Sequence, residues 1–176
     1  NQGWLPTVVR GDSGVGMTLE KALGVGPNTS TGPDLLNIEL KSSRSRKSGK
    51  TSLFAKTPKW DSEGRIRLLN KHGYHDPKRD RWALYHSIHG HMESASGWRL
   101  RVDEKGGHVF VDRHGEPVVE WDVTTLEESL LKKHRETIFV EAESRGKGEG
   151  EEFHYVRATH AAVPSIDRFL SLIPDG

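Results

Sequence analysis

The sequence predicts a mixed α/β (α+β) domain with a central mixed sheet flanked by helices. Three observations support this prediction. A helix pattern followed by a strand lies near the N-terminus, strand patterns separated by glycine turns fill the middle, and a helix, a strand pair and a final helix close the chain. The 176 residues, 33% of them hydrophobic, suffice for one core, and we expect residues 1–176 to form a single domain.

The N-terminal part contains one predicted helix and two predicted strands. The helix lies between Ser13, a suitable N-cap, and Gly24, a suitable stop. The residues that would share its apolar face are Val15, Leu19 and Leu23. A loop rich in Gly, Pro, Ser and Thr follows at residues 26–33, and strands are predicted at residues 35–42 and 51–57.

The middle of the chain reads as an antiparallel meander. Residues 58–81 are rich in turn-forming and basic residues, and no element is predicted there. A strand is predicted at residues 82–89. Three more strands are predicted at residues 98–103, 109–112 and 118–121, with Gly106-Gly107 and His114-Gly115 supplying the turns.

The C-terminal part alternates helix and strand. A capping box beginning at Thr125 predicts a helix that runs to about Arg135. A charged, glycine-rich loop at residues 145–151 separates two further strand patterns. The remaining predicted elements are strands at residues 137–143 and 153–159 and a closing helix at residues 165–172.

Composition limits the function classes. The formal net charge is only +1, so any nucleic-acid binding must come from local basic patches. The absence of cysteine excludes disulfides and thiolate metal sites. No apolar run is long enough to span a bilayer and no secretory signal is visible, so we expect a cytoplasmic protein. The chain begins at Asn1 without methionine, and we expect a domain excised from a larger protein.

The strand at residues 35–42 carries the most informative chemistry. Successive side chains on a strand point to opposite faces, so Glu39 and Lys41 share one face and Asp34 stands at the strand's entrance. Two carboxylates can hold a hard divalent cation, and a neighbouring lysine can orient a water or offset charge on a phosphate. This arrangement predicts a metal-dependent phosphodiesterase. A surface strand with an ordinary ion pair is the plainer alternative.

Three linked segments resemble a known nuclease family. They are Leu-Glu-Lys-Ala-Leu-Gly-Val at residues 19–25, Pro-Asp-Leu-Leu-Asn-Ile-Glu-Leu-Lys-Ser at residues 33–42 and Thr-Ser-Leu-Phe-Ala at residues 51–55. Together they resemble the MvaI/BcnI-like branch of the PD-(D/E)XK endonucleases, which is related to MutH. The resemblance is close over residues 11–57 and weaker over residues 124–172.

The resemblance implies an active site and a reaction. Its residues would be Glu20, Asp34, Glu39 and Lys41, with Mg²⁺ as the metal and Mn²⁺ able to substitute. Asp34 and Glu39 would bind the metal, and we expect the backbone carbonyl of Leu40 to add a ligand. The implied reaction is hydrolysis of double-stranded DNA by a monomeric catalytic domain, fused to or working with other domains. Without the resemblance, an exposed helical glutamate is the favoured interpretation of Glu20.

Basic residues after the catalytic strand are the expected DNA contacts. Phosphate contacts need Lys and Arg on flexible segments near the site, and their contribution falls with salt. The candidates are Arg44, Arg46, Lys47, Lys50, Lys56, Arg79 and Arg81. Solvated loops are the plainer alternative for each.

Two other functions compete with the nuclease hypothesis. One is a catalytically weak DNA-binding module of the same fold that recognises a specific or modified site for a partner. The other is a zinc hydrolase built on His86, His89 and His91 with His72 and His75 nearby. On a strand His86 would point away from His89 and His91, which weakens the zinc hypothesis.

Overall fold

The computed structural model describes residues 2–25, 37–45, 52–103 and 105–175. It divides into two compact units. The first unit comprises Asn1–Ala55 and Ser129–Pro164, and the second comprises Lys56–Glu128 and Ser165–Gly176. The expected single domain stays a prediction, whereas the predicted mixture of helices and strands is confirmed. No helix in the described ranges is long and apolar enough to cross a membrane.

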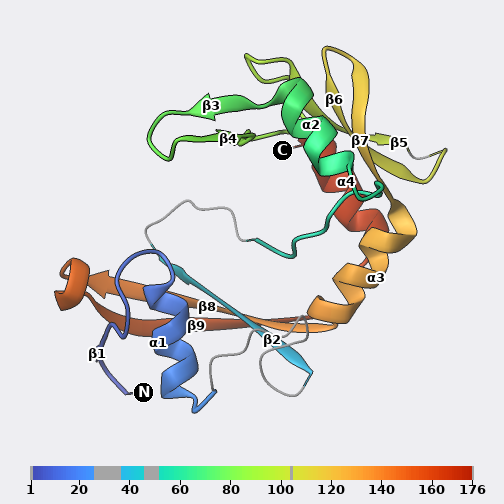
Figure 1. Cartoon of the computed structure of the whole chain (residues 1–176). Helices are drawn as coiled ribbons and strands as arrows, with labels where there is room; N and C mark the ends of the chain where they lie inside the picture. The colour runs from blue at the N-terminus through green and yellow to red at the C-terminus, as the bar shows by residue number, and fades with distance from the viewer. Residues whose placement is uncertain (1, 26–36, 46–51, 104, 176) are drawn as a thin grey trace. The chain divides into compact units, whose positions relative to one another are not determined.

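The first unit is built on a mixed sheet of four strands in the order β1-β9-β8-β2 (Figure 1). The strands are β1 (Leu5–Pro6), β2 (Ile38–Arg44), β8 (Glu136–Arg145) and β9 (Glu152–Ala162). β8 and β9 form an antiparallel hairpin, β1 pairs antiparallel with β9, and β2 pairs parallel with β8. The predicted strand with Glu39 and the predicted C-terminal strand pair are therefore confirmed, both at their expected places.

The helix α1 (Gly14–Ala22) lies beside this sheet and supplies its core. Val15 packs with Ala142 and Phe153, and the Tyr155 hydroxyl donates a hydrogen bond of 2.7 Å to the Val15 carbonyl. Gly14 lets the backbone at Val9 pass close to the start of α1, because a Cβ at this position would lie 2.7 Å from the Val9 carbonyl oxygen. The predicted helix is confirmed.

The predicted apolar face of α1 is confirmed only in part. Val15 and Leu19 are buried, whereas Leu23 is 53% exposed. The helix ends at Ala22, and Leu23 is its C-cap residue, beyond the buried part of the helix.

The second unit contains the predicted meander. Its strands β5 (Trp98–Asp103), β6 (His108–Arg113) and β7 (Glu116–Asp122) form an antiparallel sheet. His114 and Gly115 both have positive φ, as a two-residue hairpin turn requires. The other elements of the unit are α2 (Gly64–His72), β3 (Tyr74–Asp76), β4 (Arg81–Ala83) and α4 (Ile166–Asp175). The predicted closing helix is thus confirmed as α4.

Two predicted strands and one helix start are wrong, and one helix was missed. Residues 52–57 form no strand; the Leu53 carbonyl accepts a hydrogen bond from His134 and the Lys56 carbonyl accepts one from Trp121. Residues 84–89 likewise leave the strand pattern after β4. The helix α3 (Val123–His134) begins before Thr125, so the capping box does not open it. The missed helix is α2.

Candidate active site

The strand β2 presents Glu39 and Lys41 on one face, as its alternation predicts. The Lys41 Nζ lies 2.7 Å from Glu39 Oε1. The glutamate is only 1% exposed, so its charge is removed from water and needs a compensating cation. The sequence therefore predicted both members of this ion pair and their common face.

A second lysine reaches the same carboxylate. Lys133, near the end of α3, places its Nζ 3.5 Å from Glu39 Oε1. β8 follows α3 and pairs parallel with β2, with Thr137 opposite Glu39, so the end of α3 is brought to the start of β2. Lys133 was not predicted, because only this long-range strand pairing brings it to Glu39.

The second oxygen of Glu39, Oε2, is the atom that could coordinate a cation. Glu39 Oε2 is buried and has no hydrogen-bond partner among the described residues. A buried carboxylate oxygen without a donor is costly, and a hard divalent cation prefers such an oxygen. The donor chemistry of Glu39 thus fits a Mg²⁺ ligand. The described residues contain no group of three or more His, Asp or Glu that could hold a metal by themselves. Asp34, the predicted second carboxylate, lies outside them.

A buried histidine supports the sheet beside this pair. His134 Nε2 lies 2.6 Å from the Leu53 carbonyl, which can only accept, so this nitrogen carries the proton. Its Nδ1 lies 2.9 Å from the Thr137 hydroxyl, directly opposite Glu39 in the strand register. His134 therefore ties the segment at Leu53 to the strand next to the site. No local pattern around His134 indicates this role.

Two further predicted site residues lie on α1 and on β2 itself. Glu20 is half-buried on α1, and Gly16 one turn earlier lies against Ser42 of β2. Ser42 belongs to the strand face opposite to Glu39, so α1 covers that opposite face. Leu40 is buried between the two site residues of β2. Roles for Glu20 and for the Leu40 carbonyl stay predictions.

Arg44 is held by contacts within the protein. Its guanidinium binds Glu151 through two hydrogen bonds of 2.7 and 2.9 Å and donates to the Gly11 carbonyl at 2.9 Å. It also lies over the Phe153 ring, 5.1 Å from the centroid. The hydrogen bond that Arg44 donates to Glu151 raises the pKa of Arg44 above its ordinary value. These contacts place Arg44 at the junction of α1 and the β8–β9 hairpin, and we expect its main role to lie there. Its contact with DNA stays a prediction.

The remaining DNA candidates divide into two groups. Lys56, Arg79 and Arg81 are exposed in the second unit. Arg79 pairs with Asp76 at 3.3 Å and Arg81 donates to the Tyr85 hydroxyl at 3.1 Å. The candidates outside the described residues are Arg46, Lys47 and Lys50.

The histidines of the second unit have aromatic neighbours rather than metal-site geometry. The ring of His86 lies 5.2 Å from that of Trp98, and the rings of His89 and His91 are 5.4 Å apart. The Nδ1 atom of His72 accepts a hydrogen bond of 2.9 Å from the Arg113 guanidinium. With no metal-type cluster in the described ranges, these contacts give no support to the zinc hypothesis.

Comparisons with known proteins agree with this arrangement. Two solved structures of restriction endonuclease MvaI resemble the chain. The complex with cognate DNA substrate has a TM-score of 0.88 at 23% identity, covering 99% of this chain and 74% of that chain. MvaI without DNA has a TM-score of 0.56 at 20% identity, covering 99% and 80%. At these identities the likeness shows the fold alone. No curated protein sequence matches.

A family model decides the identity. The model described as the MvaI/BcnI restriction endonuclease family matches residues 1–176, the full length of the chain. Restriction endonucleases cleave DNA, which confirms the predicted enzyme class. The chain therefore belongs to the MvaI/BcnI restriction endonuclease family.

Proposed function

We propose that this protein is a Mg²⁺-dependent endonuclease of the PD-(D/E)XK type that hydrolyses phosphodiester bonds of double-stranded DNA, as a restriction or nicking enzyme. The observation that carries the proposal is the buried Glu39 carboxylate, which has two lysines on Oε1 and no partner on Oε2. In that combination the carboxylate can bind a cation through Oε2, while the lysines beside Oε1 can contact an anionic phosphate. Membership of the MvaI/BcnI family supports DNA as the substrate.

Glu39 and Asp34 would hold the metal, with Glu39 Oε2 as the oxygen already turned away from the lysines. A bound divalent cation supplies polarisation of the scissile phosphate and a lower pKa for a coordinated water. Burial of Glu39 keeps its carboxylate fixed, so little reorganisation is needed when the charge changes. Glu20 and the Leu40 carbonyl are the proposed additional groups at this site.

The two lysines, Lys41 and Lys133, would act on the attacking water and on the DNA phosphate. Lys41, 2.7 Å from Glu39 Oε1, is placed to hold a water near the carboxylate. Lys133 is 30% exposed and 3.5 Å from the same oxygen, so it can turn toward a phosphate without leaving a buried charge unpaired. We propose that Lys133 offsets the negative charge that grows on the phosphate oxygens.

The proposal also covers the organisation of the chain, its alternative metal, its DNA contacts and its location. A match of one family model over residues 1–176 supports a single nuclease module comprising both units. We propose that this module acts as a monomer. Mn²⁺ is proposed as a substitute for Mg²⁺. Lys56, Arg79 and Arg81 remain the proposed DNA contacts in the second unit. A cytoplasmic location and fusion to further domains are part of the proposal.

A plasmid assay tests the proposal. Supercoiled DNA with defined methylation is incubated with the protein and Mg²⁺, Mn²⁺ or EDTA, and nicked and linear products are measured. We expect products with Mg²⁺ and Mn²⁺ and none with EDTA, and we expect Lys41→Ala to lose cleavage with its fold intact. Binding to DNA without cleavage in any metal would instead favour the DNA-binding module, and equal rates for Lys41→Ala and wild type would refute the site.

A further inference from the structure

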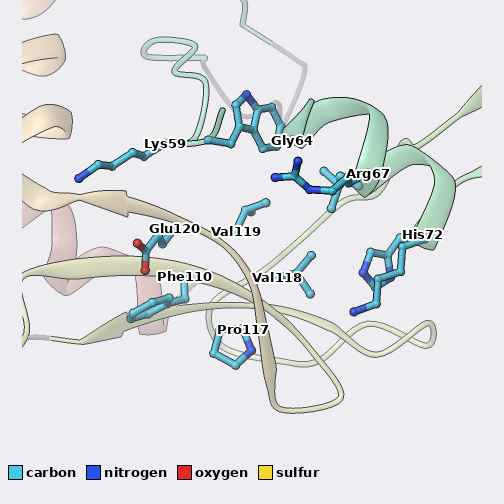
Figure 2. Close-up of a pocket in the computed structure, with 12 residues that line it drawn as sticks. Lys59, Gly64, Arg67, His72, Phe110, Pro117, Val118, Val119 and Glu120 are labelled. Atoms are coloured by element: carbon cyan, nitrogen blue, oxygen red, sulfur yellow. The ribbon is translucent and has the colours of Figure 1, made fainter. Parts of the chain in front are cut away.

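The second unit contains a pocket that the proposed active site does not use. It lies between α2 and the β6–β7 hairpin and has a volume of about 490 Å³ (Figure 2). This volume falls within the range of about 300–1,000 Å³ that is typical of small-molecule sites. Glu39, Lys41 and Lys133 all belong to the first unit, so the pocket is a separate feature of the chain.

The wall of the pocket is apolar and aromatic. Phe110, Pro117, Val118 and Val119 come from β6 and β7 and line the hairpin side of the pocket (Figure 2). Trp60 adds a second large ring. The Arg101 guanidinium lies over the Phe110 ring at 5.3 Å from the centroid, which holds that ring in place. A flat apolar ligand would find preformed contact area here.

Glycine at position 64 maintains the aromatic wall. A Cβ added at Gly64 would overlap the Cβ and Cγ atoms of Trp60. The missing side chain thus lets the tryptophan lie directly against the start of α2. The position of Trp60 is therefore set by the backbone of the helix and is not a chance orientation on the surface.

The rim of the pocket is mainly cationic. Lys59, Arg67 and Lys71 line it together with one carboxylate, Glu120. Asp122 lies 3.6 Å from Lys59 and Asp61 lies 2.9 Å from Arg67. Glu63 also lies 3.9 Å from Arg67. The groups around Arg67 are exposed, and ion pairs between exposed groups contribute little and exchange readily for another anion, whereas Asp122 is half-buried.

His72, at one end of the pocket, has a pKa that is affected by the nearby positive charges. Burial lowers the pKa of His72, and the nearby charges of Arg113 and Lys71 lower it further. Figure 2 shows the ring beside the hairpin residues. Burial is the larger cause of this shift, and the positive charges of Arg113 and Lys71 are the part that would also favour an anion nearby.

We propose that this pocket binds one unpaired nucleotide of a DNA strand, with the base against Trp60 and Phe110 and the phosphate at Lys59, Arg67 and Lys71. A phosphate alone would not need the aromatic wall, and an apolar ligand would not need the cations. A base inside a duplex cannot enter such a pocket unless it leaves the stack, which costs free energy. The pocket should therefore favour DNA that already carries an unpaired nucleotide. The inference rests on the proposed function, because it takes DNA as the substrate.

Fluorescence anisotropy in EDTA tests this inference without cleavage. Three labelled duplexes are compared: one fully paired, one with a single unpaired thymidine, and one with an abasic residue at that position. We expect the unpaired thymidine to strengthen binding about 10-fold over both other duplexes, as stacking of one base on an aromatic ring allows. Trp60→Ala should lose this preference and keep its affinity for the paired duplex.

Controls separate the pocket from general effects on folding and binding. Trp82→Ala removes another tryptophan of the same unit, which is 59% exposed, and should keep the preference. Lys71→Gln keeps the aromatic wall and should weaken binding to the unpaired duplex more than to the paired one. Circular dichroism and the melting temperature verify that each variant is folded.

The outcomes distinguish this inference from the proposed function. Equal affinity of wild type for the thymidine and abasic duplexes overturns the pocket, even if the paired duplex is bound and is cleaved with Mg²⁺. Saturable binding of free thymidine monophosphate without that preference also overturns it and assigns the pocket to free nucleotides. If the paired duplex is neither bound nor cleaved, both the inference and the proposed function fail.

Discussion

The Nζ of Lys41 and the Oε1 of Glu39 lie 2.7 Å apart on one face of β2, and the carboxylate is almost completely buried. A buried charge is tolerated only when it is paired, so Lys41 stabilises Glu39 in the form that a metal site needs. Oε2 has no hydrogen-bond partner among the described residues. In the site that we propose, the ion pair directs one oxygen to the lysines and the other to the cation.

Replacing Glu39 by glutamine should separate metal binding from folding. Glu39→Gln keeps the shape of the side chain but removes the charge that would hold the cation. We expect cleavage to fall at least about 100-fold and Mn²⁺ binding, followed by calorimetry, to weaken. The matched control is Glu141→Gln, because Glu141 lies on the neighbouring strand β8 and pairs with Arg157 at 3.5 Å. Unchanged Mn²⁺ affinity in folded Glu39→Gln would contradict the metal assignment.

Lys133 should act on the rate more than on DNA affinity. With Lys133→Met the phosphate loses a nearby cation, and we expect single-turnover cleavage to fall about 100-fold. Binding to duplex DNA in EDTA should change little, and Lys133→Arg should recover part of the rate. Lys132→Met changes the exposed neighbour on α3 and should cleave normally. A loss of affinity equal to the loss of rate would show that Lys133 only attracts DNA.

Arg44 should matter for stability and not for DNA. Arg44→Lys keeps the charge but loses the two-point contact with Glu151, whose side chain is only 13% exposed. We expect the free energy of unfolding to fall by about 2–3 kcal/mol in urea, because a largely buried carboxylate loses its fork of donors. Arg145→Lys is the matched control, since Arg145 pairs with Glu152 on the exposed part of the same hairpin. Reduced DNA affinity with unchanged stability would restore Arg44 as a phosphate contact.

Local sequence information sufficed for part of the site. The alternation of Ile38 and Leu40 with Glu39 and Lys41 fixes which side chains share a face, and neighbours along the strand decide it. The meander was equally predictable, because His114 and Gly115 supply the positive φ values that its second turn needs. In both cases the residues that form the sequence pattern are the same neighbouring residues that determine the local structure.

Other features depend on contacts that the local sequence does not contain. Lys133 reaches Glu39 only because β8 pairs parallel with β2. Residues 52–57 alternate like a strand, yet the Leu53 and Lys56 carbonyls bond to side chains from distant segments. The helix α2 has few apolar residues, and Ile66 is 55% exposed, so no apolar stripe marks it. Tertiary contacts decide these elements.

The Tyr155 hydroxyl should link stability to pH in the alkaline range. It donates to the Val15 carbonyl at 2.7 Å, and burial raises the pKa of Tyr155 to about 12. At neutral pH, Tyr155→Phe removes that hydrogen bond, and we expect a loss of about 1 kcal/mol in the free energy of unfolding.

The sign of the alkaline effect follows from the raised pKa. Between pH 10 and 12 the unfolded chain releases the tyrosine proton while the folded protein retains it, so wild-type stability falls through this window. Tyr155→Phe lacks this group, and its stability should fall less steeply over the same range in urea titrations. Tyr85→Phe, at an exposed tyrosine, should follow the wild-type curve. Parallel curves for wild type and Tyr155→Phe would show that the Tyr155 hydroxyl titrates alike in both states and is not held by the core.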